Sequence, residues 1–132
     1  MAYGTRVVVG QQWEDVVDQV AGALAEQDFV VLAELDLRAV MQAELDVDMP
    51  DQRVLGVCRK PLADAALQVE PSLGLLLPIR VVVRAESPEV TVVEAVDPVM
   101  MVAITGDPAL EPLVHDSARR LAAALHSLPG RL

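Results

Sequence analysis

The side chains best suited to chemistry are a cysteine and the basic residues that follow it near the middle of the chain. Cys58 is followed directly by Arg59 and Lys60, and Pro61 then favours the first turn of a helix. Positive charge and a helix N-terminus both lower the pKa of a nearby thiol, which favours the reactive thiolate. Cys58 is therefore a candidate nucleophile or redox thiol. The alternative is a buried, unreactive residue at the end of a strand, because free cysteine is among the most buried residue types.

The same basic residues suit anion binding. Arg59 and Lys60 lie between a predicted strand and a predicted helix, and Arg80 begins a later strand. If these strand ends meet, two guanidinium groups and an ammonium group converge on free backbone N–H groups, which suits phosphate, sulfate or carboxylate. The sequence therefore predicts a small-anion site formed by Arg59, Lys60 and Arg80. The alternative is that these bases pair with surface carboxylates such as Asp64 or Glu70.

Other patterns predict structure and not chemistry. An acidic cluster lacks the glycine and the downstream bidentate glutamate of a calcium loop, so it predicts a solvated turn; its members are Glu44, Asp46, Asp48 and Asp51. Met100 and Met101 predict core packing, and His115 and His126 are about three helical turns apart, too far to share a metal. The sequence matches no common catalytic or nucleotide-binding motif. We therefore expect no metal site, no cofactor and no catalytic group beyond the candidate Cys58.

Length and composition narrow the class of protein. The 132 residues fit a single domain, 1–132, and 53% of them are hydrophobic but only 2% aromatic, so valine, leucine and alanine must form the core. A lone cysteine without a leader suits a reducing cytoplasm and excludes a disulfide scaffold. A net charge of −10 disfavours nucleic acid, and no apolar run approaches the roughly 20 residues of a membrane-spanning helix. We expect a cytoplasmic protein that binds neither nucleic acid nor membrane.

Hydrophobic periodicity predicts the elements that position these residues. The predicted strands cover 5–9, 29–35, 53–58, 80–86 and 90–96, and the last two form a hairpin. Two predicted helices cover 13–26 and 37–45, and a third begins at Pro61. The last predicted helix ends near Leu128, and Pro112 separates or kinks its first turn. The order is β-α-β-α-β-α-β-β-α. It predicts an α+β fold, with a largely antiparallel sheet of about five strands and helices packed on one face.

Several segments resemble the domain of unknown function 302 family. They are residues 55–63 with Ala66-Leu67, Glu70-Pro71 followed by residues 74–78, Asp97-Pro98 with Met100, and the strand at 29–36. The resemblance covers roughly residues 3–128. It implies a small α+β domain that forms a homodimer, and it implies no particular reaction. An excess of aliphatic residues also favours a homodimer, because exposed aliphatic patches usually mark an interface.

The chain departs from this family at the candidate site. Where the family commonly has Cys-Asn-Pro and Pro-Cys-Asn, this chain has Cys58-Arg59-Lys60 and Pro78-Ile79-Arg80. A site that needs two cysteines therefore cannot operate here, and the departures add positive charge. The sequence thus predicts a homodimeric, non-catalytic binding or accessory module for a small anionic ligand. Two alternatives stay open: a Cys58-dependent enzyme or thiol redox sensor, and a structural interaction partner of another enzyme.

Overall fold

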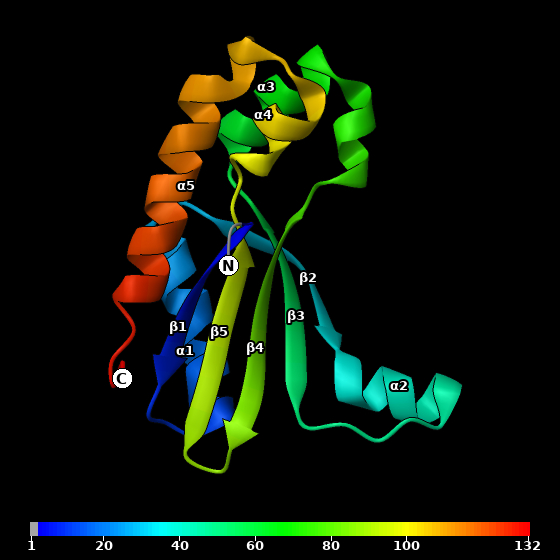
Figure 1. The fold of residues 1–132 in the computed structure, drawn as a ribbon, viewed down its shortest axis with the longest axis vertical. Coiled ribbons are helices and arrows are strands. Elements are labelled where there is room, and N and C mark those ends of the chain that lie inside the picture. Colours follow the sequence, from blue (N-terminus) through cyan, green and yellow to red (C-terminus); the bar gives the residue numbers. More distant parts are fainter. Residues whose placement is uncertain (1–2) are drawn as a thin grey trace.

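The computed structural model describes residues 3–132. Their five strands form one antiparallel sheet with the order β1-β5-β4-β3-β2 (Figure 1). The strands are β1 (Gly4–Val9), β2 (Val30–Asp36), β3 (Gln52–Cys58), β4 (Ile79–Ser87) and β5 (Val90–Val96). The helices are α1 (Trp13–Glu26), α2 (Leu37–Leu45), α3 (Lys60–Val69), α4 (Met100–Thr105) and α5 (Glu111–His126), with short 3-10 helices η1 (Pro71–Leu75) and η2 (Pro108–Leu110). The predicted α+β class and element order are confirmed, with the short helix α4 added before α5.

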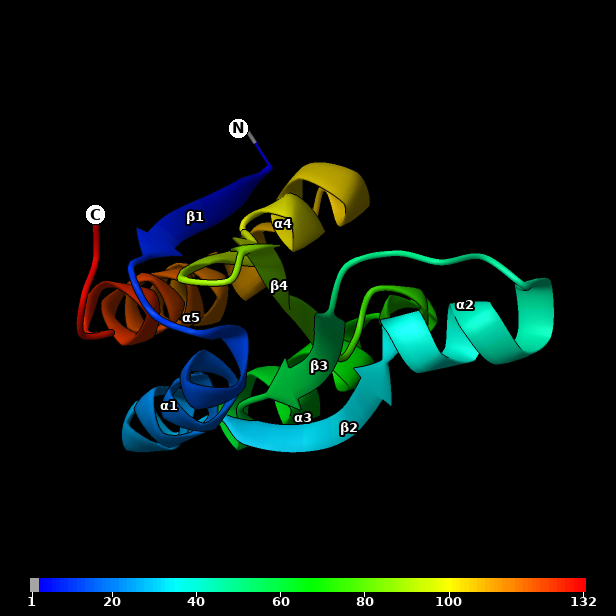
Figure 2. The same ribbon diagram turned by 90° about the horizontal axis from the view of Figure 1, so that it is seen from below.

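The strand register divides the sheet into two faces. Successive side chains of a strand point to opposite faces, so ladder partners share a face. The core face carries Val7, Val9, Leu55, Val57, Ile79, Val81, Val83, Val93 and Ala95. The alternate positions form the surface that we call the open face; its ladder-paired side chains include Arg6, Val8, Gln52, Val54, Arg80, Val82, Arg84, Val92 and Glu94. Helices α1 and α5 lie together against the core face (Figures 1 and 2).

Helix α1 has the apolar spacing that the sequence predicted. Its buried residues are Trp13, Val16, Val17, Val20 and Leu24. The Trp13 indole N–H donates to the Val83 carbonyl oxygen at 2.9 Å, and the Arg53 guanidinium lies 5.2 Å from the centre of the indole ring. The indole nitrogen of this large core side chain therefore has a hydrogen-bond partner, as a buried polar atom requires. Pro112 lies in the first turn of α5, and the separate turn η2 precedes it, as predicted.

Strand β2 and helix α2 protrude from the rest of the fold. All seven residues of β2 are exposed, and α2 has no buried residue. Helix α2 projects away from α1 and α5, with β3 and β4 between them (Figure 2). The Asp36 side chain caps α2 by accepting from the Ala39 N–H at 3.1 Å. We call residues 30–51, which comprise β2, α2 and the segment that leads into β3, the arm.

The two edges of the sheet differ. The end of the edge strand β1 is covered by the C-terminal residues, because the Gly10 N–H donates to the Gly130 oxygen at 2.7 Å and the Leu132 N–H to the Val8 oxygen at 2.8 Å. The other edge strand, β2, pairs with β3 alone within residues 3–132, and its register shifts between Val31 and Ala33. A shift of this kind bends a strand and hinders pairing at its free edge.

Two glycines give a test of the packing. A Cβ atom at Gly56 would lie 2.7 Å from Cγ of Pro78, whereas nothing lies within 4 Å of a Cβ at Gly22 in the middle of α1. Gly56→Ala should therefore lower the free energy of unfolding by about 1–3 kcal/mol through overpacking. Gly22→Ala should raise it by about 0.5–1 kcal/mol through helix propensity. Urea denaturation measures both, and equal effects of the two substitutions would contradict this packing.

Candidate functional site

Cys58 is buried at the end of β3. Its Sγ lies 3.7 Å from the carbonyl oxygen of Arg59, to which the thiol donates. Burial raises the pKa of the Cys58 thiol, and this outweighs the lowering by the hydrogen bond to Arg59 and by the charge of its guanidinium. The thiol is therefore protonated at neutral pH, which opposes the thiolate chemistry of a nucleophile.

Arg59 lies inside the fold and not in a surface pocket. Its side chain is 6% exposed, and its Nη1 donates to Oδ2 of Asp116 and to Oγ of Ser117, each at 3.1 Å. The guanidinium carbon lies 6.0 Å from the centre of the Phe29 ring. These contacts join the β3–α3 junction to helix α5. Arg59 thus holds two distant segments together, 57 residues apart in the sequence.

The carboxylate that receives Arg59 belongs to a larger ion-pair cluster. Asp116 also accepts from Arg119 and, at 3.0 Å, from Nε of Arg120, which in turn pairs with Asp28 at 3.1 Å. The hydrogen bond from Arg120 is the main cause that lowers the pKa of Asp116, and Arg119 adds to it. The charge of Arg59 is therefore compensated within the fold by a carboxylate that stays ionised at neutral pH.

The other two predicted bases have different surroundings. Lys60 is exposed and pairs with Asp64 at 2.8 Å, one helical turn along α3, and this hydrogen bond raises the pKa of Lys60. That pairing is the surface alternative considered from the sequence. Arg80 is exposed on the open face and makes no ion pair or side-chain hydrogen bond within residues 3–132. Of the three predicted anion ligands, Arg80 alone is without a carboxylate partner in the described chain.

The open face around Arg80 is positively charged. Arg6 pairs with Glu94 at 3.1 Å, and Arg84 pairs with the other oxygen of the same carboxylate. Among the ladder-paired positions of this face, three arginines against one glutamate give a net charge of +2, in a chain whose net charge is −10. Glu86, at the register shift that ends the β4–β5 ladder, has no ladder partner and is not counted. The sequence analysis did not identify this surface, although the alternation of Arg80, Val82 and Arg84 along one strand was the signal for it.

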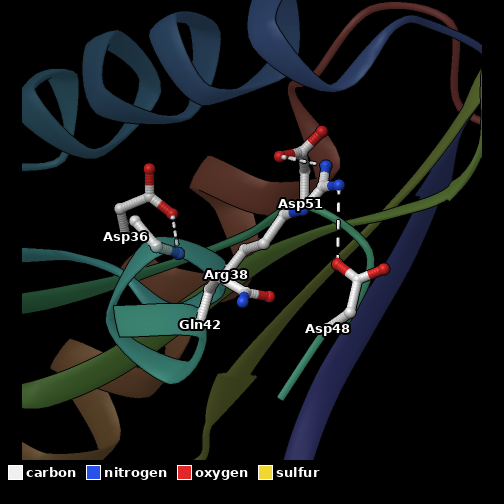
Figure 3. Close-up of a pocket in the computed structure, with 6 residues that line it drawn as sticks. Asp36, Arg38, Gln42, Asp48 and Asp51 are labelled. Atoms are coloured by element: carbon white, nitrogen blue, oxygen red, sulfur yellow. Dashed lines mark hydrogen bonds and ion pairs between the residues drawn. The ribbon is translucent and has the colours of Figure 1, made fainter. Parts of the chain in front are cut away.

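A shallow hollow lies between α2 and the segment that follows it (Figure 3). Its volume is about 310 Å³, and it is lined by Asp36, Arg38, Ala39, Gln42, Asp48 and Asp51. Arg38 pairs with Asp48 at 3.6 Å and with Asp51 at 3.4 Å, so the hollow contains its own counter-charge. These pairs tie the segment at 46–51 to α2, and the three carboxylates remain exposed or half-buried. The arrangement supports the fold of the arm and offers no free ligand set.

Residues 3–132 contain no group of three histidine, cysteine, aspartate or glutamate side chains placed to hold a metal ion. Among the same residues, every helix is too short or too polar to cross a lipid bilayer.

Comparison with known proteins gives a family and a fold. Residues 5–128 match the family described as domain of unknown function DUF302. The crystal structure of an uncharacterized conserved DUF302 protein from Bacillus stearothermophilus superposes with a TM-score of 0.85 at 26% sequence identity, and the match covers 96% of this chain and 98% of that one. No curated protein matches the chain.

Thiol labelling tests the state of Cys58. Because the thiol is buried and protonated, a disulfide reagent should modify native protein at least about 100-fold more slowly than protein unfolded in denaturant, since the native form must open first. Absorbance of the released reagent group follows the reaction, and Cys58→Ser gives the background. Similar rates in native and denaturing buffer would show an accessible thiolate and contradict the assignment.

Substitution of the two neighbouring bases separates a structural arginine from a surface lysine. Arg59→Ala leaves Ser117 and part of Asp116 without a donor inside the fold, so it should cost on the order of 2–4 kcal/mol of stability. Lys60→Ala removes an exposed pair and should leave stability nearly unchanged. Thermal unfolding followed by circular dichroism compares the two. If the variants are equally stable, Arg59 does not hold α5 to the β3–α3 junction.

Proposed function

The chain belongs to the DUF302 family, and from the geometry of this member we propose that it is a homodimeric, non-catalytic binding module that accepts an anionic partner on the open face of its sheet. The observation that carries the proposal is Arg80. Its guanidinium is exposed and lacks an ion pair within residues 3–132, although the chain has twice as many carboxylates as basic side chains. A base left unpaired in so acidic a protein is available to a ligand.

The charge distribution supports an anion at this place. Most of the surface of a chain with net charge −10 repels an anion, whereas the open face carries a net charge of +2. Such a local excess attracts and concentrates a ligand of opposite sign. A guanidinium is the side chain best suited to hold an oxyanion, because it offers parallel donors to two oxygens at once.

The state of the reactive groups supports a non-catalytic role. Cys58 donates to a backbone carbonyl, and burial keeps its thiol protonated. Nδ1 of His126 lies 2.7 Å from the Ala122 carbonyl oxygen at the end of α5, and no hydrogen bond joins either histidine to Cys58 within the described chain. A covalent mechanism needs a nucleophile within reach of a base. Binding is therefore the simpler function.

Self-association is supported by the apolar surface of the arm. Val30, Leu32 and Leu45 are each more than half exposed, and they lie on one protruding unit. Exposed aliphatic groups gathered in one region of a protein mark an interaction surface more often than scattered ones do.

The lone free thiol suits a cytoplasmic protein, where glutathione keeps cysteines reduced.

Thermal melts test the anion site. Phosphate, or a small dicarboxylate, should raise the Tm of the wild type by several degrees above chloride of equal ionic strength, because a ligand at about 100 times its Kd stabilises by about 2.7 kcal/mol. Arg80→Ala should remove that rise. Arg131→Ala is the matched control, because Arg131 also lacks a side-chain partner among residues 3–132 but lies beside β1 at the C-terminus.

The control matters because some anions stabilise any folded protein by exclusion from its surface. If the wild type, Arg80→Ala and Arg131→Ala respond equally to every anion, there is no anion site at Arg80.

A further inference from the structure

We infer that the anionic partner of the open face is the arm of a second copy of this chain, so that two copies each lay their arm on the open face of the other. This inference rests on the proposed function, because it names the partner of the site at Arg80. It follows from three features of the described residues: an amphipathic helix without cover, two surfaces of opposite charge, and two sheet edges unsuited to pairing.

Helix α2 lacks the packing that a helix of its length requires. It has nine residues, and its apolar side chains recur at Leu37, Val40, Met41 and Leu45, which is one stripe of a helix. None of its residues is buried. An isolated helix shorter than about 12–15 residues is marginal in water, so helices of this size owe their stability to tertiary packing. Its own chain half-buries Leu37 and Met41, whereas Val40 and Leu45 stay exposed and are the part of the stripe that a second copy can cover.

The open face supplies an apolar surface of the right kind. Val8, Val54 and Val82 are only half-buried on it, because α1 and α5 pack on the other face of the sheet. Val8 follows Arg6 on this face, and Val82 lies between Arg80 and Arg84 and pairs with Val54, so aliphatic and cationic side chains alternate on it. Val40 and Leu45 of a second copy can bury their side chains there, which removes apolar area of both copies from water.

Charge favours the pairing of an arm with an open face over the pairing of two arms or of two open faces. The arm has six carboxylates and the single base Arg38, a net charge of −5, and the open face has a net charge of +2. Two arms would repel each other, and so would two open faces, whereas an arm and a face attract. Glu44 on α2 makes no ion pair within residues 3–132, which is also true of Arg80. Asp36 and Asp46 also lack an ion pair there, but each accepts a hydrogen bond within the arm, so Glu44 is the arm carboxylate that best complements Arg80.

Pairing through the sheet edges is the less favourable arrangement. The edge at β1 is shortened by the C-terminal residues, which hydrogen-bond to Val8 and Gly10 at its end. The edge at β2 carries the register shift between Val31 and Ala33, which interrupts the regular ladder that a further strand would need. Contact between α2 of one copy and the open face of the other needs no strand pairing at either edge.

The first experiment asks whether the arm forms the interface. Sedimentation equilibrium of the wild type should give twice the chain mass of 14.2 kDa. Leu45→Asp, which changes a side chain 63% exposed in the single chain, should raise the dimer Kd by at least about tenfold, because it places a charge in a desolvated contact. Ile104→Asp is the matched control, because Ile104 is 62% exposed but lies in α4; it should leave the Kd unchanged.

The second experiment asks what the arm touches. Arg80→Glu and Glu44→Arg should each weaken the dimer, because each places like charges at both contacts. A 1:1 mixture of the two variants should associate more tightly than either variant alone. In the mixed pair one contact keeps the original charges and the other has them reversed, so both contacts attract. Circular dichroism verifies that each variant is folded.

The outcomes separate this inference from the proposed function. A wild type that stays monomeric overturns the homodimer and arm exchange together. A dimer that Leu45→Asp leaves intact overturns arm exchange alone, and so does a mixture no tighter than its components. If phosphate raises the Tm through Arg80 while Arg80→Glu leaves the dimer unchanged, the site takes a small anion and the arm is not its ligand.

Discussion

The antiparallel register of the five strands is the constraint on which the rest of the structure depends. It places the large aliphatic side chains of the central strands on the core face, where α1 and α5 cover them, and it places Arg80 and Arg84 on the other face together with Val82. A shift of one residue in any ladder would exchange the two sets. Because α1 and α5 pack against the core face, the register also leaves a mixed apolar and cationic surface on the other side of the sheet. That surface is where a partner is expected to bind.

The ion pair of Arg59 with Asp116 determines which of the predicted bases can serve a ligand. Asp116 neutralises the charge of Arg59 inside the fold, where the guanidinium joins the end of β3 to α5 and lies beside Phe29. Removing one member of such a buried pair is costly, so this arginine is held by structure. Lys60 is engaged locally by Asp64. Positive charge therefore remains free on the open face, at Arg80, and not at the helix N-terminus beside Cys58.

Local periodicity made the elements predictable, and long-range contacts limited the prediction of the site. The spacing of Trp13 to Leu24 marked α1, and the Lys60–Asp64 pair lies within one helical turn, so both could be inferred from neighbours in the sequence. The partner of Arg59 is 57 residues away, and no local pattern indicates it. The pKa of Cys58 depends on the balance between burial and the adjacent positive charge, and the degree of burial cannot be inferred from the neighbouring residues. Adjacent bases favour the thiolate, but burial outweighs them.

Hydrogen exchange at two protein concentrations tests the uncovered arm most directly. If a second copy covers α2, the backbone amides of α2 should be protected well above the dimer Kd and exchange much faster well below it. The amides of α1, which packs within its own chain, should exchange at the same rate under both conditions. Arm exchange predicts this contrast between α1 and α2. Equal protection of α2 at both concentrations would contradict it, because the helix would then be stable without a partner.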